Sequence, residues 1–472
     1  MAAVEEHERR KSPNPGRPLR WVEIVQGSVV GLGVVLLVAV ALFAYRGGAM
    51  AAFLGSSPPD VIIIVVADAV RADRVSCYGY AAKQTPHISA LARDGVLYRD
   101  ANVQTSWTKP SVATILTSLY PSTHQARSYT DILPDEVLTL PEILSVHGYD
   151  TVGFVTNYNL FPRFNFQQGF REYYALDGIE SSWHLDGNKF YHQAELMNRS
   201  VLPWLEANSG GRRSPSGGQR FFMYLHYMDP HRPYFLHPYD GRGYYSEDLA
   251  LLKEISDAYD GEIAYFDKHF GALIATLKRL GLYDEALIIF TSDHGEEFYE
   301  HQGWAHGKTL YQEITSVPLI IKYPGNAHAG TVDEGLAHSL DIAPTVLDVA
   351  GVEPPPAMRG VSLLLPADSP ARNRAAVAET QQKGWAIALR TPRYKLIEVI
   401  DGNLRGRAPT QLYDLAADPG ETMNLAATRP DVLARLRADL SQTLALAERA
   451  AVGGQQADLD PAFRERLRQL GY

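Results

Sequence analysis

Cysteine is almost absent from this chain, and positive charge is in deficit. Cys77 is the only cysteine among 472 residues. A single cysteine cannot form an internal disulfide or a thiolate-rich zinc or iron–sulfur site, so any metal must be held by histidines and carboxylates. Lys and Arg total 44 against 54 Asp and Glu, a formal net charge of −10. This acidic balance argues against a protein that binds nucleic acid through its net charge.

The overall composition is that of a globular protein. Hydrophobic residues make up 46% of the chain and charged residues 21%, which excludes a largely disordered, collagen-like or multi-span membrane protein. The length alone suggests about three domains.

Near the N-terminus, residues 24–45 carry no charge and consist mainly of Val, Leu, Ala and Gly. As a helix they would rise about 33 Å, enough to cross a bilayer. Five positive charges precede this run and only Arg46 follows closely, so residues 1–23 are expected in the cytoplasm and the rest of the chain outside. A cleaved signal peptide is the alternative, with Ala49-Met50-Ala51 as the cleavage site. Residues 46–59 read as a linker.

Short hydrophobic runs alternate with helical patterns through the body of the chain. Continuous rather than alternating hydrophobicity predicts strands that are buried on both faces of a parallel sheet. Capping Thr, early Pro and terminal Gly residues mark helices between the runs. The expected fold is doubly wound α/β. The predicted strands are residues 61–67, 152–156, 221–227, 286–291 and 317–323, and the predicted helices include 85–95, 139–148 and 255–280.

Acids and histidines follow several of these predicted strands. Asp68 follows the first strand, Asp229 and His231 follow the third, and Asp293 and His294 follow the fourth. Open α/β sheets bind ligands at the carboxyl ends of their strands. Any one of these side chains could be a cap or loop residue, but their repeated placement predicts a common site.

Thr108 lies two residues before Pro110, at the expected start of an apolar helix. The N–H groups and the positive dipole end at that position stabilise an anion or a developing alkoxide. Taken alone, Thr108 is better explained as the N-cap of that helix.

Together these segments resemble the sulfatases of the alkaline phosphatase superfamily over residues 60–425. The matching segments are VIIIVVADAVRADRVSCYGY (61–80), WTKPSVATILTSLYP (107–121), LHYMDPHRPY (225–234), IIFTSDHGEE (288–297), HGKTLYQEITSVPLIIKYPG (306–325) and LYDLAADPGETMNLA (412–426). The resemblance implies an alkaline phosphatase-like, mostly parallel sheet flanked by helices. It implies a catalytic domain at 60–370 and a smaller antiparallel subdomain at 371–425, followed by a helical tail at 426–472.

The chain departs from the sulfatase pattern at the nucleophile. Sulfatases use Cys or Ser, oxidised to formylglycine, in the motif C/S-x-P-x-R. Here Thr108 occupies the first position and Val112 the last. Oxidation of Thr would give a ketone rather than the aldehyde. Cys77 cannot replace it, because neither the Pro nor the Arg of the motif follows that residue.

What remains is similar to the Thr-nucleophile branch of the superfamily, which includes membrane-anchored phosphoethanolamine transferases. That resemblance implies one divalent metal ion bound by Asp68, Thr108, Asp293 and His294. An imidazole ligand, with Ala69 where calcium-binding sulfatases often carry a second Asp, favours zinc or manganese, although calcium stays possible.

The resemblance also implies catalytic roles for Thr108, His231, His306 and Lys308. Thr108 would attack a phosphoester and form a phosphothreonine, and the other three would contact the transferred group or protonate the leaving oxygen. The substrate would be a phosphorylated or sulfated small molecule, a glycan or a lipid headgroup. Two alternatives stay open, a sulfuric ester hydrolase that works without formylglycine and an inactive binding protein that kept the fold.

Overall fold

The structure is a computed structural model that describes residues 57–176, 193–209, 220–238, 243–244, 246–382, 384–402, 406–461 and 463–464. The predicted membrane anchor at 24–45 lies outside these residues. Among the described residues, no helix combines the length and the apolar character that crossing a bilayer requires. Residues from Ser56 onward form one compact unit, and the predicted division at 370 and 425 stays a prediction.

A central sheet of eight strands organises the fold. Its order is β11-β2-β10-β7-β1-β6-β4-β5. Within this sheet only β10 runs antiparallel to its neighbours, β7 and β2, so the sheet is mixed, although most of its pairings are parallel as predicted. The strands are β1 (Val61–Ala67), β2 (Val96–Asn102), β4 (Tyr149–Val155), β5 (Glu172–Ala175), β6 (Arg220–Tyr227), β7 (Leu287–Thr291), β10 (Leu319–Lys322) and β11 (Thr331–His338).

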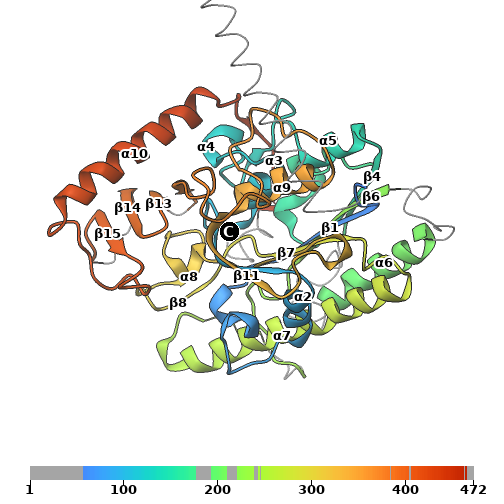
Figure 1. Cartoon of the computed structure of the whole chain (residues 1–472). Helices are drawn as coiled ribbons and strands as arrows, with labels where there is room; N and C mark the ends of the chain where they lie inside the picture. The colour runs from blue at the N-terminus through green and yellow to red at the C-terminus, as the bar shows by residue number, and fades with distance from the viewer. Residues whose placement is uncertain are drawn as a thin grey trace, which may run out of the picture. The chain divides into compact units, whose positions relative to one another are not determined.

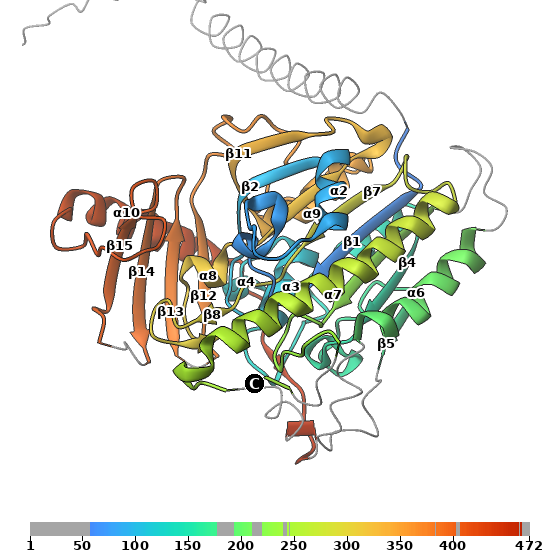
Figure 2. The same cartoon turned by 90° about the horizontal axis from the view of Figure 1, so that it is seen from below.

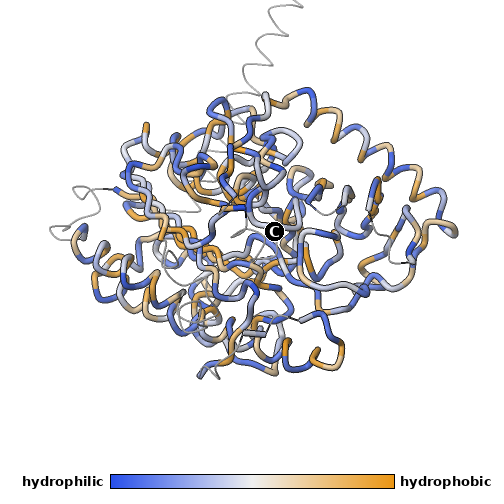
Figure 3. The backbone as a smooth tube through the Cα atoms, turned by 180° about the vertical axis from the view of Figure 1, so that it is seen from behind, coloured by the Kyte–Doolittle hydropathy of each residue, from blue (hydrophilic) through white to orange (hydrophobic). Residues whose placement is uncertain are grey.

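The continuous hydrophobic runs of the sequence form the central strands of this sheet. All seven residues of β1 are buried, as expected for a strand covered on both faces. Figure 3 shows hydrophobic segments running through the centre of the fold. Three strands, β2, β5 and β11, were not predicted. They lie at or near the sheet edges and mix exposed with buried residues, so they lack a continuous apolar run.

Helices cover both faces of the sheet (Figures 1 and 2). On one face α7 contacts both α2 and α6, and on the other α3 contacts α5 and α9. The predicted helix near 139–148 has the expected start, because Thr139 and Glu142 form a reciprocal capping box. The helices are α2 (Pro86–Asp94), α3 (Thr108–Thr117), α5 (Leu140–Val146), α6 (Gln193–Ser209), α7 (Leu252–Arg279) and α9 (Ile342–Val349).

The C-terminal part is a four-stranded antiparallel sheet with one long helix, which confirms the predicted small antiparallel sheet. Its strands are β12 (Ala376–Thr380), β13 (Trp385–Arg390), β14 (Tyr394–Asp401) and β15 (Thr410–Asp414), in that order. Helix α10 (Pro430–Arg449) packs on them through Val432, Leu436 and Leu440. Shorter elements include α4 (Pro121–His124), α8 (Gln312–Thr315), β3 (Asp131–Ile132), β8 (Glu297–Phe298), β9 (Trp304–Ala305) and β16 (Gln455–Gln456).

A buried ion pair ties this C-terminal part to helix α8. Lys395 of β14 lies 3.0 Å from the carboxylate of Glu421, and both side chains are almost fully buried. Glu421 also accepts a hydrogen bond from the backbone N–H of Gln312, the first residue of α8. Within α8, the carbonyl of Ile314 accepts a hydrogen bond from the N–H of Gly295. The C-terminal sheet thereby supports the loop that follows β7.

We expect the Lys395→Met variant to lose about 3–5 kcal/mol of unfolding free energy, because the Glu421 carboxylate would be left buried without its cation. Urea unfolding of the purified protein measures this loss. The matched control is Arg437→Met, which breaks the exposed pair with Glu398 and should cost less than about 1 kcal/mol. Equal losses of unfolding free energy in the two variants would contradict the prediction that the buried ion pair stabilises the fold more than the exposed one.

Candidate active site

Four segments that lie far apart in sequence meet at the carboxyl edge of the sheet. Asp68 directly follows β1, Thr108 opens α3, Asn157 follows β4, and Asp293 and His294 follow β7. All five side chains are completely buried. Because β1 lies between β7 and β6, which adjoins β4, the ends of these parallel strands deliver their loops to one place.

The turn after β1 places Asp68 beside Asp293. Ala69 adopts a left-handed backbone conformation with φ of 61°, which is uncommon for a residue with a Cβ atom. Its N–H donates to Asp293 Oδ1 at 3.1 Å, and its carbonyl accepts the hydroxyl of Tyr259 at 2.7 Å. The Tyr259 oxygen also accepts the N–H of Arg71. These hydrogen bonds offset the backbone strain and fix the direction of Asp68.

The hydroxyl of Thr108 points into the cluster rather than capping its helix. Trp107 occupies the N-cap position of α3, so the capping interpretation of Thr108 is wrong. Thr108 Oγ1 lies 3.5 Å from Asp68 Oδ2 and 3.4 Å from His294 Nε2. The side-chain amide of Asn157 donates to Asp68 at 2.7 Å and to Thr108 at 3.3 Å. The nucleophile candidate therefore faces both acidic and imidazole groups.

The residues present fit a divalent cation. Single ligand atoms of Asp68, Asp293 and His294 all lie within 4.8 Å of one another. Asp68 Oδ1 and Asp293 Oδ2 are buried and accept no hydrogen bond from any residue that the structure describes, so each carboxylate keeps one oxygen that can bind a cation. His294 Nδ1–H donates to the carbonyl of Gly295 at 2.8 Å, which directs Nε2 towards the carboxylates, as in metal-bound imidazoles.

The electrostatics of the cluster also favour a bound cation. Burial and the neighbouring charge of Asp68 raise the pKa of Asp293, because two adjacent carboxylates resist being ionised together. Burial disfavours a charged imidazole at His294, but the charges of Asp293 and Asp68 outweigh it and raise the pKa of His294. A cation between these groups would relieve the repulsion between the two carboxylates.

His226 and Asn157 stand beside the predicted ligands but were not in the predicted set. His226 Nε2 lies 3.1 Å from Asp68 Oδ2, and its Nδ1 lies 3.1 Å from the hydroxyl of Tyr224. His226 belongs to β6, where a histidine inside a hydrophobic strand reads as a core residue. Asn157 gives a clearer signal, because it sits two residues after β4 at the same edge as the predicted acids.

Two further predicted histidines border the cluster. The ring of His306 lies 4.2 Å from that of His294, and the ring of His231 lies 4.9 Å from that of His306, between centroids. His306 Nδ1–H donates to Glu296 at 3.0 Å, and His231 Nδ1–H donates to the carbonyl of Arg232 at 2.6 Å. Burial lowers the pKa of both imidazoles. The structure thus brings His231 and His306 to the site with fixed ring orientations.

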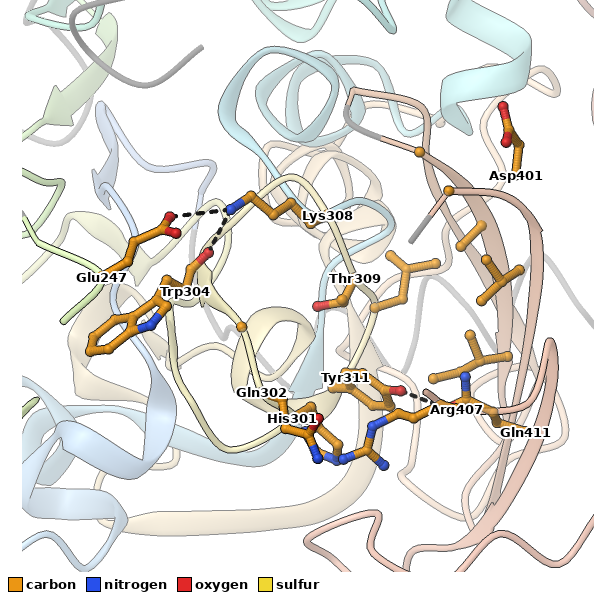
Figure 4. Close-up of a pocket in the computed structure, with 17 residues that line it drawn as sticks. Glu247, His301, Gln302, Trp304, Lys308, Thr309, Tyr311, Asp401, Arg407 and Gln411 are labelled. Atoms are coloured by element: carbon orange, nitrogen blue, oxygen red, sulfur yellow. Dashed lines mark hydrogen bonds and ion pairs between the residues drawn. The ribbon is translucent and has the colours of Figure 1, made fainter. Parts of the chain in front are cut away.

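Lys308 is placed differently from the other predicted catalytic residues. Its ammonium donates to the carbonyl of Trp304 at 3.2 Å and lies 3.6 Å from a carboxylate oxygen of Glu247. Figure 4 shows it at the wall of a separate cavity. The structure does not bring Lys308 into the Thr108 cluster, and its catalytic role stays a prediction.

Comparison with known proteins agrees with this fold and site. A family model described as Sulfatase matches residues 60–352, and one described as N-sulphoglucosamine sulphohydrolase, C-terminal, matches residues 300–449. The multifunctional alkaline phosphatase superfamily protein PehA of Trinickia caryophylli is 26% identical over 77% of this chain and 91% of its own length. The N-acetylglucosamine-6-O-sulfatase of Bacteroides thetaiotaomicron is 24% identical over 77% of this chain and 82% of its own length. The phosphonate monoester hydrolase of Agrobacterium radiobacter superposes with a TM-score of 0.65 at 23% identity, covering 83% of this chain and 96% of that enzyme.

The fold and these matches define a hydrolase of the alkaline phosphatase superfamily. Within that superfamily, the chain belongs to the sulfatase family, as its motifs predicted. Sulfatase-family enzymes use a divalent metal, and Asp68, Asp293 and His294 form a candidate site for it.

We expect the Asp293→Asn variant to bind the divalent metal more than about tenfold more weakly than the unchanged protein. The reason is that an amide nitrogen replaces one of the carboxylate oxygens that can bind the cation. Metal content per chain, measured by plasma mass spectrometry, checks this. Asp229→Asn is the matched control, since Asp229 is also buried after a strand but its carboxylate accepts the N–H of Ala194. Equal metal loss in the two variants would contradict the assigned ligands.

Proposed function

We propose that this protein is a metal-dependent ester hydrolase or transferase that attacks phosphoesters directly with Thr108. The observation that carries the proposal is the position of the Thr108 hydroxyl. It lies at the start of α3, within 3.5 Å of Asp68 and 3.4 Å of His294. A hydroxyl held at a helix N-terminus beside candidate metal ligands is well placed to become a nucleophile.

Formylglycine chemistry does not suit these residues. The Cβ atom of Thr108 carries a methyl group, so its oxidation stops at a ketone, which lacks the hydrogen of an aldehyde. Val112, at the family's Arg position, is fully buried and apolar. Burial raises the pKa of the Cys77 thiol, and Cys77 packs against the hydrophobic core instead of opening a helix at the site.

The ligand set favours zinc or manganese as the metal. Ala69 is fully buried at the position where calcium-binding sulfatases often place a second Asp, and His294 adds an imidazole. Calcium prefers six to eight oxygen ligands, whereas zinc and manganese accept mixed nitrogen and oxygen sets. Asp68, Asp293, His294 and the Thr108 oxygen would hold the ion, which would supply Lewis-acid stabilisation and lower the pKa of the hydroxyl.

The proposed reaction proceeds in two displacements. The Thr108 oxygen attacks phosphorus while the bond from phosphorus to the leaving alcohol breaks, which gives a phosphothreonine. Water or an acceptor hydroxyl then attacks the same phosphorus and restores Thr108, so hydrolysis and transfer differ only in the second nucleophile. Asn157 already donates to the Thr108 oxygen and orients it in the resting site. His231 and His306 are the candidates for holding the transferred group or protonating the leaving oxygen.

The comparisons support ester hydrolysis but do not distinguish phosphate esters from sulfate esters as the substrate. PehA is described as a multifunctional alkaline phosphatase superfamily protein, and the Bacteroides thetaiotaomicron relative is described as an N-acetylglucosamine-6-O-sulfatase. The second candidate function is therefore a sulfuric ester hydrolase that uses Thr108 without formylglycine. A phosphorylated or sulfated small molecule, glycan or lipid headgroup would be the substrate in either case.

We expect Thr108→Ala to lower kcat on phosphodiesters by about 10³-fold or more, because it removes the nucleophile. Thr108→Ser, which keeps the hydroxyl, should retain most of the activity and form a phosphoserine. A panel of nitrophenyl phosphomonoesters, phosphodiesters and sulfates measures turnover, and mass spectrometry of acid-quenched enzyme detects the phosphorylated residue.

The control for this substitution is Thr117→Ala, in the same helix. Thr117 is buried and its hydroxyl donates to the carbonyl of Ala113, away from the cluster, so its loss should leave kcat unchanged. Full activity in Thr108→Ala would exclude the mechanism. Faster turnover of sulfates than of phosphates, with a dependence on Thr108, would favour the second candidate function.

We further propose that residues 24–45 anchor the chain in a membrane, with the catalytic domain on the extracytoplasmic side. The support is the uncharged apolar run and the excess of positive charge before it.

In bacterial expression, we expect the full chain to stay with membranes after alkaline carbonate washing. A double variant with Leu36→Arg and Leu37→Arg should be released, since each Arg at the centre of a membrane helix costs about 2.5–3.5 kcal/mol. Replacement of Leu444 and Leu446 by Arg, outside the run, is the control. A mature protein that begins near residue 50 would instead establish a cleaved signal peptide.

A further inference from the structure

After α10 the chain leaves the C-terminal sheet and returns to the loops around the central sheet. We call its described residues, 455–461 and 463–464, the C-terminal strap. Within the strap, β16 pairs antiparallel with β3, and the N–H of Ala457 donates to the carbonyl of Thr130 at 2.7 Å. Figure 2 shows the last described residues, in red, apart from the C-terminal sheet. The strap is therefore a connection to the central part of the fold that is separate from α8.

Phe463 anchors the end of the strap. Its side chain is buried, and its ring centroid lies 6.1 Å from that of Tyr158 and 5.9 Å from that of Phe164. The guanidinium carbon of Arg163 lies 3.7 Å from the centre of the Phe463 ring, and Arg163 also lies 3.8 Å from the carboxylate of Asp460. Aromatic and cation–π contacts of this kind add to the gain from apolar burial. They hold the strap against these loop residues.

The loop under this aromatic anchor begins at a residue of the candidate active site. Asn157 is the N-cap of the short 3-10 helix η3 (Tyr158–Leu160), and its Oδ1 accepts the N–H of Asn159 at 2.9 Å. The amide nitrogen of the same side chain donates to Asp68 and Thr108. One side chain thus joins η3 to the cluster, so a shift of η3 would move this amide relative to the Thr108 hydroxyl.

A second set of contacts leads from the strap to Lys109, the residue after the nucleophile candidate. Lys109 is completely buried, and its ammonium donates to the carbonyls of Tyr129 and Asp131. The ammonium also lies 3.4 Å from the centre of the Phe164 ring. Asp131 opens β3, the strand that pairs with the strap, and Phe164 is one of the two rings that contact Phe463. The strap therefore contacts the residues that hold the first turn of α3.

We propose that Phe463 is a positioning residue of the active site, which acts through Asn157 on the Thr108 hydroxyl. The anchored strap restricts the movement of η3 and keeps the Asn157 amide within hydrogen-bond distance of Thr108. A displacement of about 1 Å in a reacting group can lower a rate by about 10²-fold, so this restriction matters for turnover. The expected effect on turnover rests on the proposed function, whereas the order of η3 can be measured without any substrate.

Hydrogen exchange of the full chain tests the structural step. We expect Phe463→Ala to speed exchange of the backbone amides of residues 159–161 by at least about tenfold, because η3 loses the ring that covers it. The control is Leu440→Ala, which removes a buried side chain between α10 and the C-terminal sheet and should leave these amides unchanged. Unchanged exchange in Phe463→Ala overturns the proposal.

Turnover of the nitrophenyl substrates tests the catalytic step. We expect Phe463→Ala to lower kcat by about tenfold to hundredfold and to change KM by less than about twofold, with the metal content unchanged, since a misplaced nucleophile slows only the chemical step. Phe463→Leu, which keeps an apolar side chain, should lower kcat by only about threefold. Leu440→Ala should keep its kcat at a temperature at which circular dichroism shows the variants folded. Equal kcat values for Phe463→Leu and the unchanged protein, or equal losses in Phe463→Ala and Leu440→Ala, would overturn the proposal.

A double-mutant cycle tests whether the effect passes through Asn157. In the Asn157→Ala background, Phe463→Ala should lower kcat by no more than about twofold further, because the amide that transmits the effect is already gone. Fully additive losses would overturn this route. The two proposals also fail separately. Full turnover in Thr108→Ala rejects the proposed function, whereas unchanged exchange at η3 in Phe463→Ala rejects the positioning role even if Thr108→Ala is inactive.

Discussion

The fold places two fully buried carboxylates side by side. Asp68 and Asp293 follow β1 and β7, which pair in parallel register with Val66 opposite Thr291, so their ends coincide. Both side chains are fully buried. Buried like charges are costly unless a cation or a proton lies between them. The left-handed Ala69, the orienting hydrogen bond of His294 and the amide of Asn157 all serve this arrangement, which also brings the Thr108 hydroxyl to the same point.

Support for that arrangement comes from outside the central sheet. The N–H groups of Gly295 and Glu296, next to the ligand His294, donate to carbonyls of Ile314 and Glu313. This segment is continuous with α8, which the buried Glu421 caps. The C-terminal sheet therefore does more than cover the catalytic domain. It holds the metal-site loop on one side and forms a wall of the cavity of about 360 Å³ on the other.

Local sequence patterns predicted the centre of the fold well and its edges poorly. The continuous apolar runs of β1, β6 and β7 identify strands buried on both faces, and the capping box at Thr139 marks a helix start. Strands β2, β5 and β11 escaped prediction because these strands, at or near the sheet edges, mix buried and exposed residues irregularly. The antiparallel direction of β10 also has no local signature, because a buried strand has the same apolar run whichever way its neighbours point.

The sequence by itself determined the chemical groups available. Thr108 stands where the family has Cys or Ser, Ala69 where it often has a second Asp, and one cysteine lies far from the nucleophile. The tertiary structure alone decided which groups meet. It brought Asn157 and His226 to Asp68 and moved Lys308 to a separate cavity. The reason is that side-chain partners in this fold lie tens to hundreds of residues apart, and packing rather than local pattern sets those contacts. Asp68 and Asp293, for example, are 225 positions apart in the sequence.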